Sequence, residues 1–457
     1  MGRRKAPIST KIGIDSSLRW IYINLYLLDI YCLKNKGFTV MLTTKNKIYK
    51  LLAMYIDYLL RFLFFILTIL FLYRKKKVTP FINIFSLCTS INPKRILIID
   101  EVLVGDIALN TPVFRLIHEK YPTANITVMI GSWAKDILKN NPHINEIMVV
   151  DCPWALYDSV FFSKKGLTEH LKFIINSTKI IKNIRSKKYD LVIDLKSDFR
   201  NIFFFIFLTR IKYSLNYHPM GEECFLTVLP TIIKKERRIE RNYGLLKYLR
   251  IDYYDKSIQL FPSEEDRRTV GHKLLENNIK QDDYICILHP GARRKVRWWP
   301  PERYAEVAEF LHQKGLKIIL TGTKDETDII NKIKKNVNFN LIDMCGELSL
   351  LEVAILLKRA AMLICPDTGI MYLAAANQTP TIALFGPNDS WQPALVNKNL
   401  YIVDKLFPCR PCTQKICKIS NNGIGACMLA ITVKDVTSIV EKILTKTNDK
   451  HLNNNES

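Results

Sequence analysis

The second half of the chain contains a stretch whose polar residues could bind an anion. Residues 365–387 (CPDTGIMYLAAANQTPTIALFGP) begin at the end of an apolar run, turn at Asp367, Thr368 and Gly369, and continue with a helical pattern. A helix that starts at the carboxyl end of a parallel strand points its free N–H groups toward that end, which suits a phosphate group. An ordinary strand–turn–helix unit with nothing bound has the same pattern, so this stretch alone leaves both interpretations open.

A second stretch places a cluster of cations just beyond another predicted strand. Residues 286–301 (CILHPGARRKVRWWPP) contain Arg293, Arg294, Lys295 and Arg297. Such a cluster suits a diphosphate, because guanidinium and ammonium groups pair with phosphate oxygens. The alternative is a solvated run of charges, and the neighbouring Trp298 and Trp299 argue against it.

Asp106 is the candidate for a catalytic base in the first half of the chain. It stands in the loop after the predicted strand 95–99, where a loop would face a cleft. A carboxylate there could take a proton from an attacking hydroxyl group. The alternative is that Asp106 caps a helix predicted from Ile107, a role that aspartate fills well. Asp100 and Glu101 lie on the same loop and are secondary candidates.

Four cysteines near the C-terminus have the spacing of a metal site. Cys409, Cys412, Cys417 and Cys427 form the pattern C-x2-C-x4-C-x9-C within nineteen residues. Four thiolates can hold a zinc ion or an iron–sulfur cluster, so a structural metal is one prediction and free thiols are the other. Two disulfides are disfavoured, since the seven remaining cysteines are scattered, several in apolar runs, as in a reduced cytosolic protein.

Alternating strands and helices must position these residues. Short apolar runs predict strands at 95–99, 125–130, 146–150, 189–195, 210–217, 284–289, 317–321, 341–344, 362–365 and 381–385. Helical patterns lie between them, one of which begins at a capping box of Ser349 and Glu352. The alternation predicts an α/β chain with two doubly wound parallel sheets that face each other across a cleft. The apolar run 201–208 is interpreted as a buried helix rather than a second membrane contact, because it is too short to span a bilayer.

The most apolar stretch, residues 51–73, precedes the first predicted strand. Asp57 and Arg61 interrupt it, and the uninterrupted part, 62–73, is shorter than the roughly twenty residues that a spanning helix needs. Basic residues flank both ends, so we expect a helix that lies in an anionic membrane interface. A single span with the basic segment 74–77 inside is the second interpretation, and a buried core helix is the third.

Length and charge agree with this organisation. The chain has 457 residues, 48% of them hydrophobic, and a formal net charge of +24. The length suits two or three domains, and the charge favours anionic partners such as phosphorylated substrates or an acidic membrane face. A merely solvated lysine-rich surface is the alternative. Nucleic acid is disfavoured, because no basic helix with interleaved aromatic residues stands out.

Taken in order, these motifs resemble glycosyltransferase family 9, the lipopolysaccharide heptosyltransferases. That family has a pattern like K-R-W-P after one strand and D-T-G-x-x-H-L-A after another. Here the two read RWWP at 297–300 and DTGIMYLA at 367–374. The sequence around Gly105 and Asp106 also resembles the opening of family members. The resemblance runs from about residue 94 to about residue 443.

The resemblance implies a GT-B fold of two Rossmann-like domains. Residues 94–260 would bind the acceptor and residues 261–446 a nucleotide sugar, preceded by an N-terminal membrane-associated helix at 45–78. Residues 1–44 would be an extension, either disordered or upstream of the true start, and 447–457 a disordered tail. The implied place is the cytoplasmic face of the bacterial inner membrane.

The resemblance also implies the chemistry. The enzyme would transfer a heptose from an ADP-heptose-like donor to a lipopolysaccharide core or related glycolipid by an inverting displacement, with Asp106 as base and no metal needed for catalysis. Donor contacts fall on Arg297, Lys295, Asp367, Thr368, Gly369, Tyr372 and Glu326, while the acceptor residues are not assigned.

Tyr372 departs from the family pattern, because it stands where the family usually has a histidine near the phosphates. Tyrosine carries no positive charge near neutral pH, so either the cluster at 293–295 supplies that charge or donor affinity is reduced. The other functions considered are a catalytically inactive membrane-surface module that binds anionic glycolipid and a nucleotide-sugar epimerase of the same fold.

Overall fold

The computed structural model describes residues 91–155, 164–211, 213–216, 238–252, 255–388, 397–412, 414, 416–420 and 423–454. The predicted extension at 1–44 and the predicted membrane helix at 45–78 lie outside these residues. Within them, no helix combines the length and the apolar character needed to cross a bilayer.

The first sheet has five parallel strands in the order β3-β2-β1-β4-β5. Its strands are β1 (Arg95–Ile99), β2 (Asn125–Ile130), β3 (Glu146–Val149), β4 (Leu191–Asp194) and β5 (Tyr213–Leu215). Its helices are α4 (Val104–Lys120), η1 (Ser132–Leu138), α5 (Lys164–Ser186), α6 (Phe199–Asn201), η3 (Ile202–Phe207) and α7 (Arg238–Tyr248). All five predicted strands of this half are present. The central strand β1 is buried along all but its first residue, as a strand covered by helices on both faces must be.

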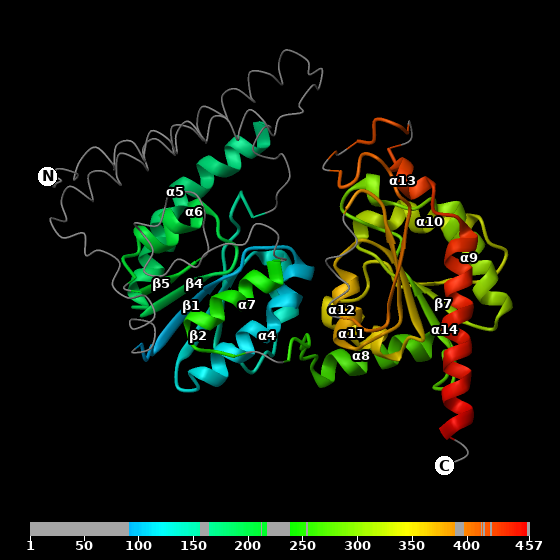
Figure 1. The fold of residues 1–457 in the computed structure, drawn as a ribbon, viewed down its shortest axis with the longest axis horizontal. Helices are drawn as coiled ribbons and strands as arrows, with labels where there is room; N and C mark the ends of the chain where they lie inside the picture. The colour runs from blue at the N-terminus through cyan, green and yellow to red at the C-terminus, as the bar shows by residue number, and fades with distance from the viewer. Residues whose placement is uncertain are drawn as a thin grey trace, which may run out of the picture.

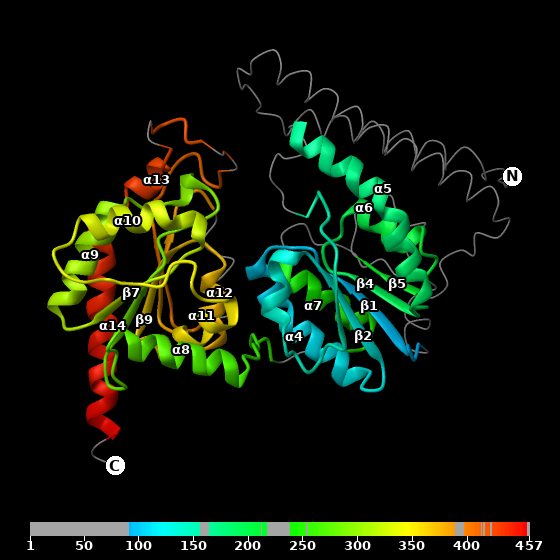
Figure 2. The same cartoon turned by 180° about the vertical axis from the view of Figure 1, so that it is seen from behind.

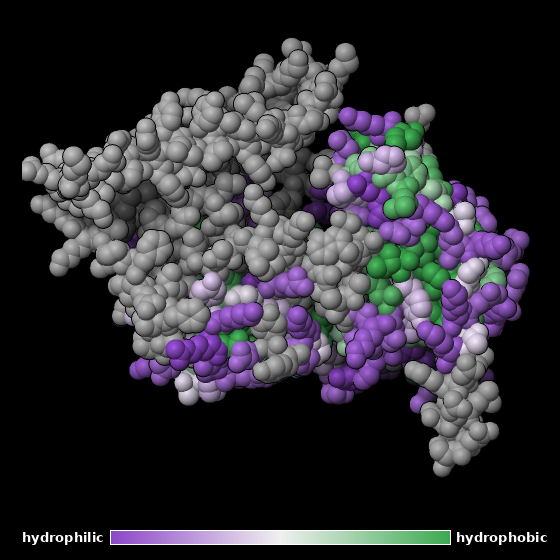
Figure 3. Space-filling model, in the orientation of Figure 1, coloured by the Kyte–Doolittle hydropathy of each residue, from purple (hydrophilic) through white to green (hydrophobic). Residues whose placement is uncertain are grey.

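The second sheet has six parallel strands in the order β11-β10-β9-β6-β7-β8. They are β6 (Ile285–Leu288), β7 (Lys317–Leu320), β8 (Ile342–Asp343), β9 (Met362–Pro366), β10 (Thr381–Phe385) and β11 (Leu400–Asp404). The helices are α8 (Glu264–Glu276), η5 (Lys295–Arg297), α9 (Pro301–Gln313), η6 (Lys324–Glu326), α10 (Thr327–Lys335), α11 (Leu350–Arg359), α12 (Ile370–Ala376), α13 (Ala426–Leu429) and α14 (Val433–Asn454). On the side shown in Figure 3 hydrophobic residues of this unit gather near α13 and in a broader patch below it, with hydrophilic residues around them.

Each sheet reverses the direction of its strand order near its middle. In the first sheet the reversal lies between β1 and β4, and in the second it lies between β6 and β9. Ligands of doubly wound sheets bind in the crevice that such a reversal leaves at the carboxyl ends of the strands. The two predicted parallel sheets are therefore confirmed, and each has one edge suited to a site.

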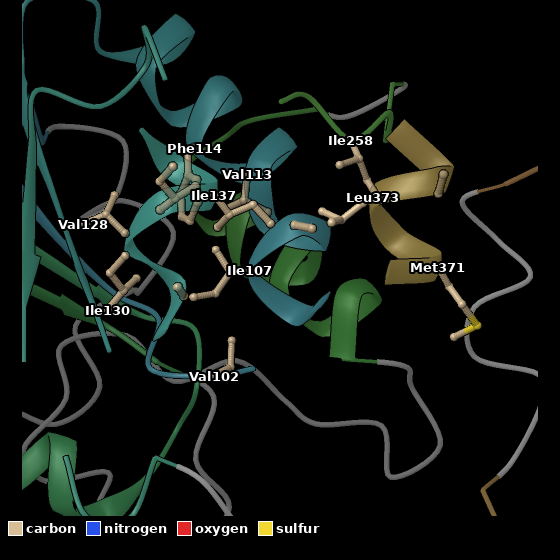
Figure 4. Close-up of a cluster of buried hydrophobic side chains, with 14 of the residues drawn as sticks. Val102, Ile107, Val113, Phe114, Val128, Ile130, Ile137, Ile258, Met371 and Leu373 are labelled. Carbon is tan, nitrogen blue, oxygen red and sulfur yellow. The ribbon is translucent and has the colours of Figure 1, made fainter. Parts of the chain in front are cut away.

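The two sheets form separate layered units whose facing helices are α4 and α12 (Figures 1 and 2). One hydrophobic cluster continues through this contact. Ile107 and Phe114 of α4 belong to it together with Met371 and Leu373 of α12, and all four side chains are at most 6% exposed. Figure 4 shows Leu373 pointing toward α4, with Ile258 of the connecting segment beside it. This apolar contact fixes the start of α4 relative to the start of α12.

Helix α4 begins earlier than the sequence predicts. Its N-cap is Leu103, which makes no side-chain capping bond, and Asp106 is the third residue of its first turn. The interpretation of Asp106 as a helix cap is therefore wrong, although a carboxylate in the first turn still interacts favourably with the helix dipole.

The C-terminal tail also differs from its prediction. Residues 447–457 were expected to be disordered, but α14 continues to Asn454. Its first half is held by the buried side chains of Val436, Val440 and Ile443. Because no glycine or proline follows before Asn454, nothing in the backbone stops a helix that this packing has already nucleated.

The predicted capping box at α11 is present and gives a test of local stability. The Ser349 hydroxyl accepts the Glu352 N–H at 3.3 Å, and the Glu352 carboxylate accepts the Ser349 N–H at 2.6 Å. Ser349→Ala should lower the free energy of unfolding by about 1 kcal/mol, read as a shift of the urea midpoint. Ser186→Ala, at an exposed position of α5, is the control, with an expected change below about 0.5 kcal/mol. Equal shifts for the two variants would show that the capping box does not stabilise the fold.

Candidate functional site

The carboxyl edge of the second sheet holds an ion pair at its strand reversal. Arg297 follows β6 and Asp367 follows β9, and these are the two strands between which the order reverses. The Arg297 Nη1 atom lies 3.4 Å from the Asp367 Oδ2 atom and donates to the Asp367 carbonyl oxygen at 3.3 Å. In the described part of the chain the buried Nε atom of Arg297 has no hydrogen-bond partner. A further acceptor, such as a phosphate oxygen, would therefore complete the bonding of this guanidinium group.

Asp367 is the charged centre of this edge. Burial raises the pKa of Asp367, the Arg297 guanidinium and the Asn388 amide oppose the rise, and the Asp106 carboxylate adds to it. The Asn388 amide donates to the Asp367 carboxylate. Asp367 is thus held within its own unit by Arg297 and Asn388.

Gly105 is a point of close contact between the two units. A Cβ atom at Gly105 would lie 3.2 Å from the Gly369 Cα atom and 2.5 Å from the Cδ2 atom of Tyr372. Only a residue without a side chain fits this contact. The Tyr372 ring therefore lies on the backbone next to Asp106, a position that the sequence did not indicate.

Asp106 is half-buried, whereas the two secondary candidates on its loop are fully buried. Asp100 accepts a hydrogen bond from the Asn110 amide at 2.9 Å. The Cys152 thiol donates to the Glu101 carboxyl at 2.8 Å, and burial raises the pKa of Glu101 to about 8. Fully buried carboxyl groups are poorly placed to meet an acceptor hydroxyl, so the half-buried Asp106 is the better candidate.

Glu326 lies between the loops that follow β6 and β7. Its Oε2 atom accepts the Thr323 N–H at 2.8 Å, and its carboxylate fills the space beside Gly291 and Gly322. His289, at the end of β6, contacts Thr321 at 3.2 Å, and burial lowers the pKa of its ring while Glu326 opposes that change. Glu326 thus lies at the carboxyl edge of the same sheet as Arg297, next to the loop that contains Arg297.

The loop between β11 and α13 forms a wall beside these residues. The Gly425 N–H donates to the Val296 carbonyl oxygen at 3.1 Å, and a Cβ atom at Gly423 would lie 3.3 Å from the Lys295 side chain. Arg410 donates to the Asn388 carbonyl oxygen at 3.0 Å. Asn388 and Arg410 were not predicted from the sequence, although Asn388 lies three residues beyond a predicted strand, where site residues of parallel sheets gather.

The four clustered cysteines lie on or beside this wall. In the described ranges no three His, Cys, Asp or Glu side chains are grouped so that they could hold a metal ion, so the structure does not bring these thiols together as ligands. Burial raises the pKa of Cys417, but hydrogen bonds led by the Ala426 N–H at 3.4 Å outweigh it and lower the pKa to about 7. Metal binding by Cys409, Cys412, Cys417 and Cys427 stays a prediction.

Comparison with known proteins identifies the family. The model of glycosyltransferase family 9 (heptosyltransferase) matches residues 177–422, more than half of the chain. The chain belongs to glycosyltransferase family 9. As a family 9 glycosyltransferase it is an enzyme, and the resemblance predicted from its motifs is confirmed.

Relatives of this family 9 chain include proteins named as heptosyltransferases. Lipopolysaccharide heptosyltransferase 3 of Escherichia coli (strain K12) is 29% identical over 300 residues, which cover 63% of this chain and 82% of the relative. Lipooligosaccharide heptosyltransferase 2 of Haemophilus ducreyi is 24% identical over 323 residues, which cover 67% of this chain and 88% of the relative.

Solved structures of family 9 share the fold. A glycosyltransferase family 9 protein from Veillonella parvula has a TM-score of 0.64 at 21% identity, covering 77% of this chain and 97% of that one. The E. coli ADP-heptose lipopolysaccharide heptosyltransferase II has a TM-score of 0.60 at 20% identity, covering 78% of this chain and 99% of that one. The two-sheet architecture of this family 9 enzyme is thus the GT-B arrangement of heptosyltransferases.

Proposed function

We propose that this enzyme transfers a heptose from an ADP-heptose-like donor to a lipopolysaccharide core or related glycolipid in one inverting displacement. The names of its relatives supply the substrate class, and the geometry supplies the roles. The observation that carries the proposal is the close approach of Gly105, the residue before Asp106, to Gly369. It brings the loop of a candidate proton acceptor against the turn that follows β9, beside an arginine with an unfilled N–H group.

The donor side is assigned to the second sheet. Arg297 would pair with the diphosphate, and the turn of Asp367, Thr368 and Gly369 would border it. Asp367 is itself acidic, so it does not bind phosphate directly. Its bonds with Arg297 and Asn388 instead hold the turn in place. Glu326 has a carboxylate, which accepts hydrogen bonds, so it suits hydroxyl groups of the nucleoside rather than phosphate oxygens.

The reaction follows from these positions. The acceptor hydroxyl oxygen attacks the anomeric carbon of the donor sugar and gives its proton to the Asp106 carboxylate. The bond between that carbon and the diphosphate oxygen breaks, and the nucleoside diphosphate leaves with the bonding electrons. Arg297 offsets the charge that develops on the leaving group. Attack from the side opposite the leaving group inverts the anomeric centre.

The function is tested by measuring nucleotide release from a panel of nucleotide sugars, with extracted lipopolysaccharide core as the acceptor. We expect release that depends on both ADP-heptose and acceptor. Release from another sugar nucleotide instead would show that the donor is not ADP-heptose. Binding of the glycolipid without turnover of any donor would instead indicate the inactive membrane-surface module.

Arg297→Ala should weaken binding of ADP, measured by calorimetry, about 10- to 100-fold. The reason is that a hydrogen bond to a charged group contributes roughly 1.5–3 kcal/mol. Arg297→Lys is the matched control, because it keeps the charge and loses only the fork of two donors, so most of the affinity should remain. Unchanged ADP affinity in the alanine variant would remove Arg297 from the donor site.

The cellular place belongs to the same proposal. The acceptor is a membrane lipid, and the chain carries a net charge of +24 together with the apolar stretch 51–73 between basic flanks. Both features suit attachment to the anionic cytoplasmic face of the inner membrane.

A further inference from the structure

The loop between β11 and α13 exposes an unusual share of the large hydrophobic side chains. Leu406 is 98% exposed, Ile416 73% and Ile419 64%. Across the described residues eight large hydrophobic side chains are exposed, and three of them lie on this one loop. Scattered single cases are normal, but a concentration of this kind marks an interaction site. We call Leu406, Ile416, Lys418 and Ile419 the loop tip.

The charge of the loop limits what can cover it. The sequence from Lys405 to Lys434 contains five lysines and arginines and no aspartate or glutamate. Lys405 pairs with Asp435 at 2.8 Å and Arg410 with Asp404 at 3.2 Å. Lys418 is exposed between Ile416 and Ile419. The loop tip therefore presents apolar side chains together with positive charge.

We propose that the loop tip inserts into the surface of an anionic phospholipid membrane. Apolar side chains that alternate with lysine suit the boundary between acyl chains and acidic headgroups, since the apolar parts leave water and the ammonium group stays at the headgroups. A second copy of the chain is a poorer occupant, because a cationic loop would approach a molecule whose net charge is +24.

The inner side of the same loop touches the donor site. The Cys412 N–H donates to the Pro387 carbonyl oxygen at 2.7 Å, and Arg410 reaches the Asn388 carbonyl oxygen at 3.0 Å. Asn388 in turn bonds Asp367. Lipid contact at the loop tip would thus hold one wall of the donor site in place. In Figures 1 and 2 the loop extends beyond α13 at the outer end of its unit, away from α8 and from the end of α14.

The test places a fluorescent side chain at the loop tip of the full-length protein. Leu406→Trp is mixed with vesicles of anionic phospholipid whose acyl chains carry bromine, a quencher that acts only at short range. The six native tryptophans are subtracted with the unsubstituted protein. Leu275→Trp on α8 is the matched control, because Leu275 is 72% exposed and lies on another face.

We expect the additional emission of Leu406→Trp to fall roughly twofold or more, and that of Leu275→Trp to stay unchanged. The loss should weaken with zwitterionic vesicles and at about 1 M salt, where surface charge is screened. Equal behaviour of the two variants overturns the proposal. No sugar donor or acceptor is used, so this result is independent of whether the proposed transfer reaction is right.

A second measurement tests whether the loop tip is instead an interface between copies of the chain. The variant Leu406→Ser/Ile416→Ser/Ile419→Ser should fold normally, because all three side chains are exposed, and should leave the sedimentation behaviour of detergent-solubilised protein unchanged. If this variant dissociates an oligomer that the unsubstituted protein forms, the loop tip is an interface between copies and the lipid proposal is wrong.

Discussion

Asp106→Asn should lower the turnover of the transfer reaction by about 10²–10⁴-fold, the usual effect of removing a positioned general base. Asparagine has nearly the same size but cannot accept the proton of the acceptor hydroxyl. The fold should persist, because Leu103 and not Asp106 is the N-cap of α4. The measurement is kcat at saturating donor and acceptor, with ADP affinity measured on the same preparations.

Glu101→Gln is the matched control for this variant. It changes a carboxyl group on the same loop, but one that is buried and bonded to Cys152. We expect its turnover to stay within a few-fold of the unsubstituted enzyme, whereas ADP affinity should be unchanged in both variants. Near-normal turnover of Asp106→Asn would mean that the base lies elsewhere, and Asp100 would be examined next.

Gly105→Ala should lower kcat/KM by roughly 10²-fold, the order expected when catalytic groups are displaced by about 1 Å. The added methyl group would lie 2.5 Å from the Tyr372 ring, so the ring or the loop has to move. The loop carries Asp106 and the ring belongs to the second unit, so either movement changes the position of Asp106 relative to that unit. Steady-state kinetics with both substrates measures the loss.

The double variant Gly105→Ala/Tyr372→Ala separates steric from chemical causes. Removing the ring leaves only the 3.2 Å contact with the Gly369 Cα atom, which a small shift relieves. We therefore expect the double variant to recover a large part of the activity that Gly105→Ala loses. If it is as inactive as Gly105→Ala, then Tyr372 acts on the donor rather than on the fit between the units. Tyr372→His, which restores the residue usual in the family, would then be informative.

Local patterns were sufficient to predict most of the fold. Buried parallel strands read as short apolar runs, so β10 was located to the residue. The edge strand β11 was not predicted, because only one of its five residues is buried and its composition gives no clear periodicity. The run 201–208 was correctly predicted to be helical, but its π-helical form, η3, has no sequence signal in the apolar composition of this segment.

The candidate site was predictable only within each half of the chain. Asp367 stands directly beyond β9 and Arg297 lies on the connection that follows β6, at the edge where a doubly wound sheet places its ligands. The contact of Tyr372 with Gly105 depends instead on how two sheets dock, and no spacing along the chain encodes that. The same holds for Arg410, whose role arises from a loop folding back over Asn388.

The apolar contact between α4 and α12 limits how enzymes of this architecture can exchange parts. Units that meet through polar, hydrated surfaces can be recombined freely, since each is complete without the other. Here Ile107 and Phe114 share one core with Met371 and Leu373, so each half supplies part of the interior of its neighbour. A change of donor or acceptor specificity by exchange of a whole half between relatives would leave this shared interior mismatched unless both helices came from one parent. We therefore expect donor or acceptor specificity to change more easily through the loops at the carboxyl edges, because these loops can change without disturbing that shared core.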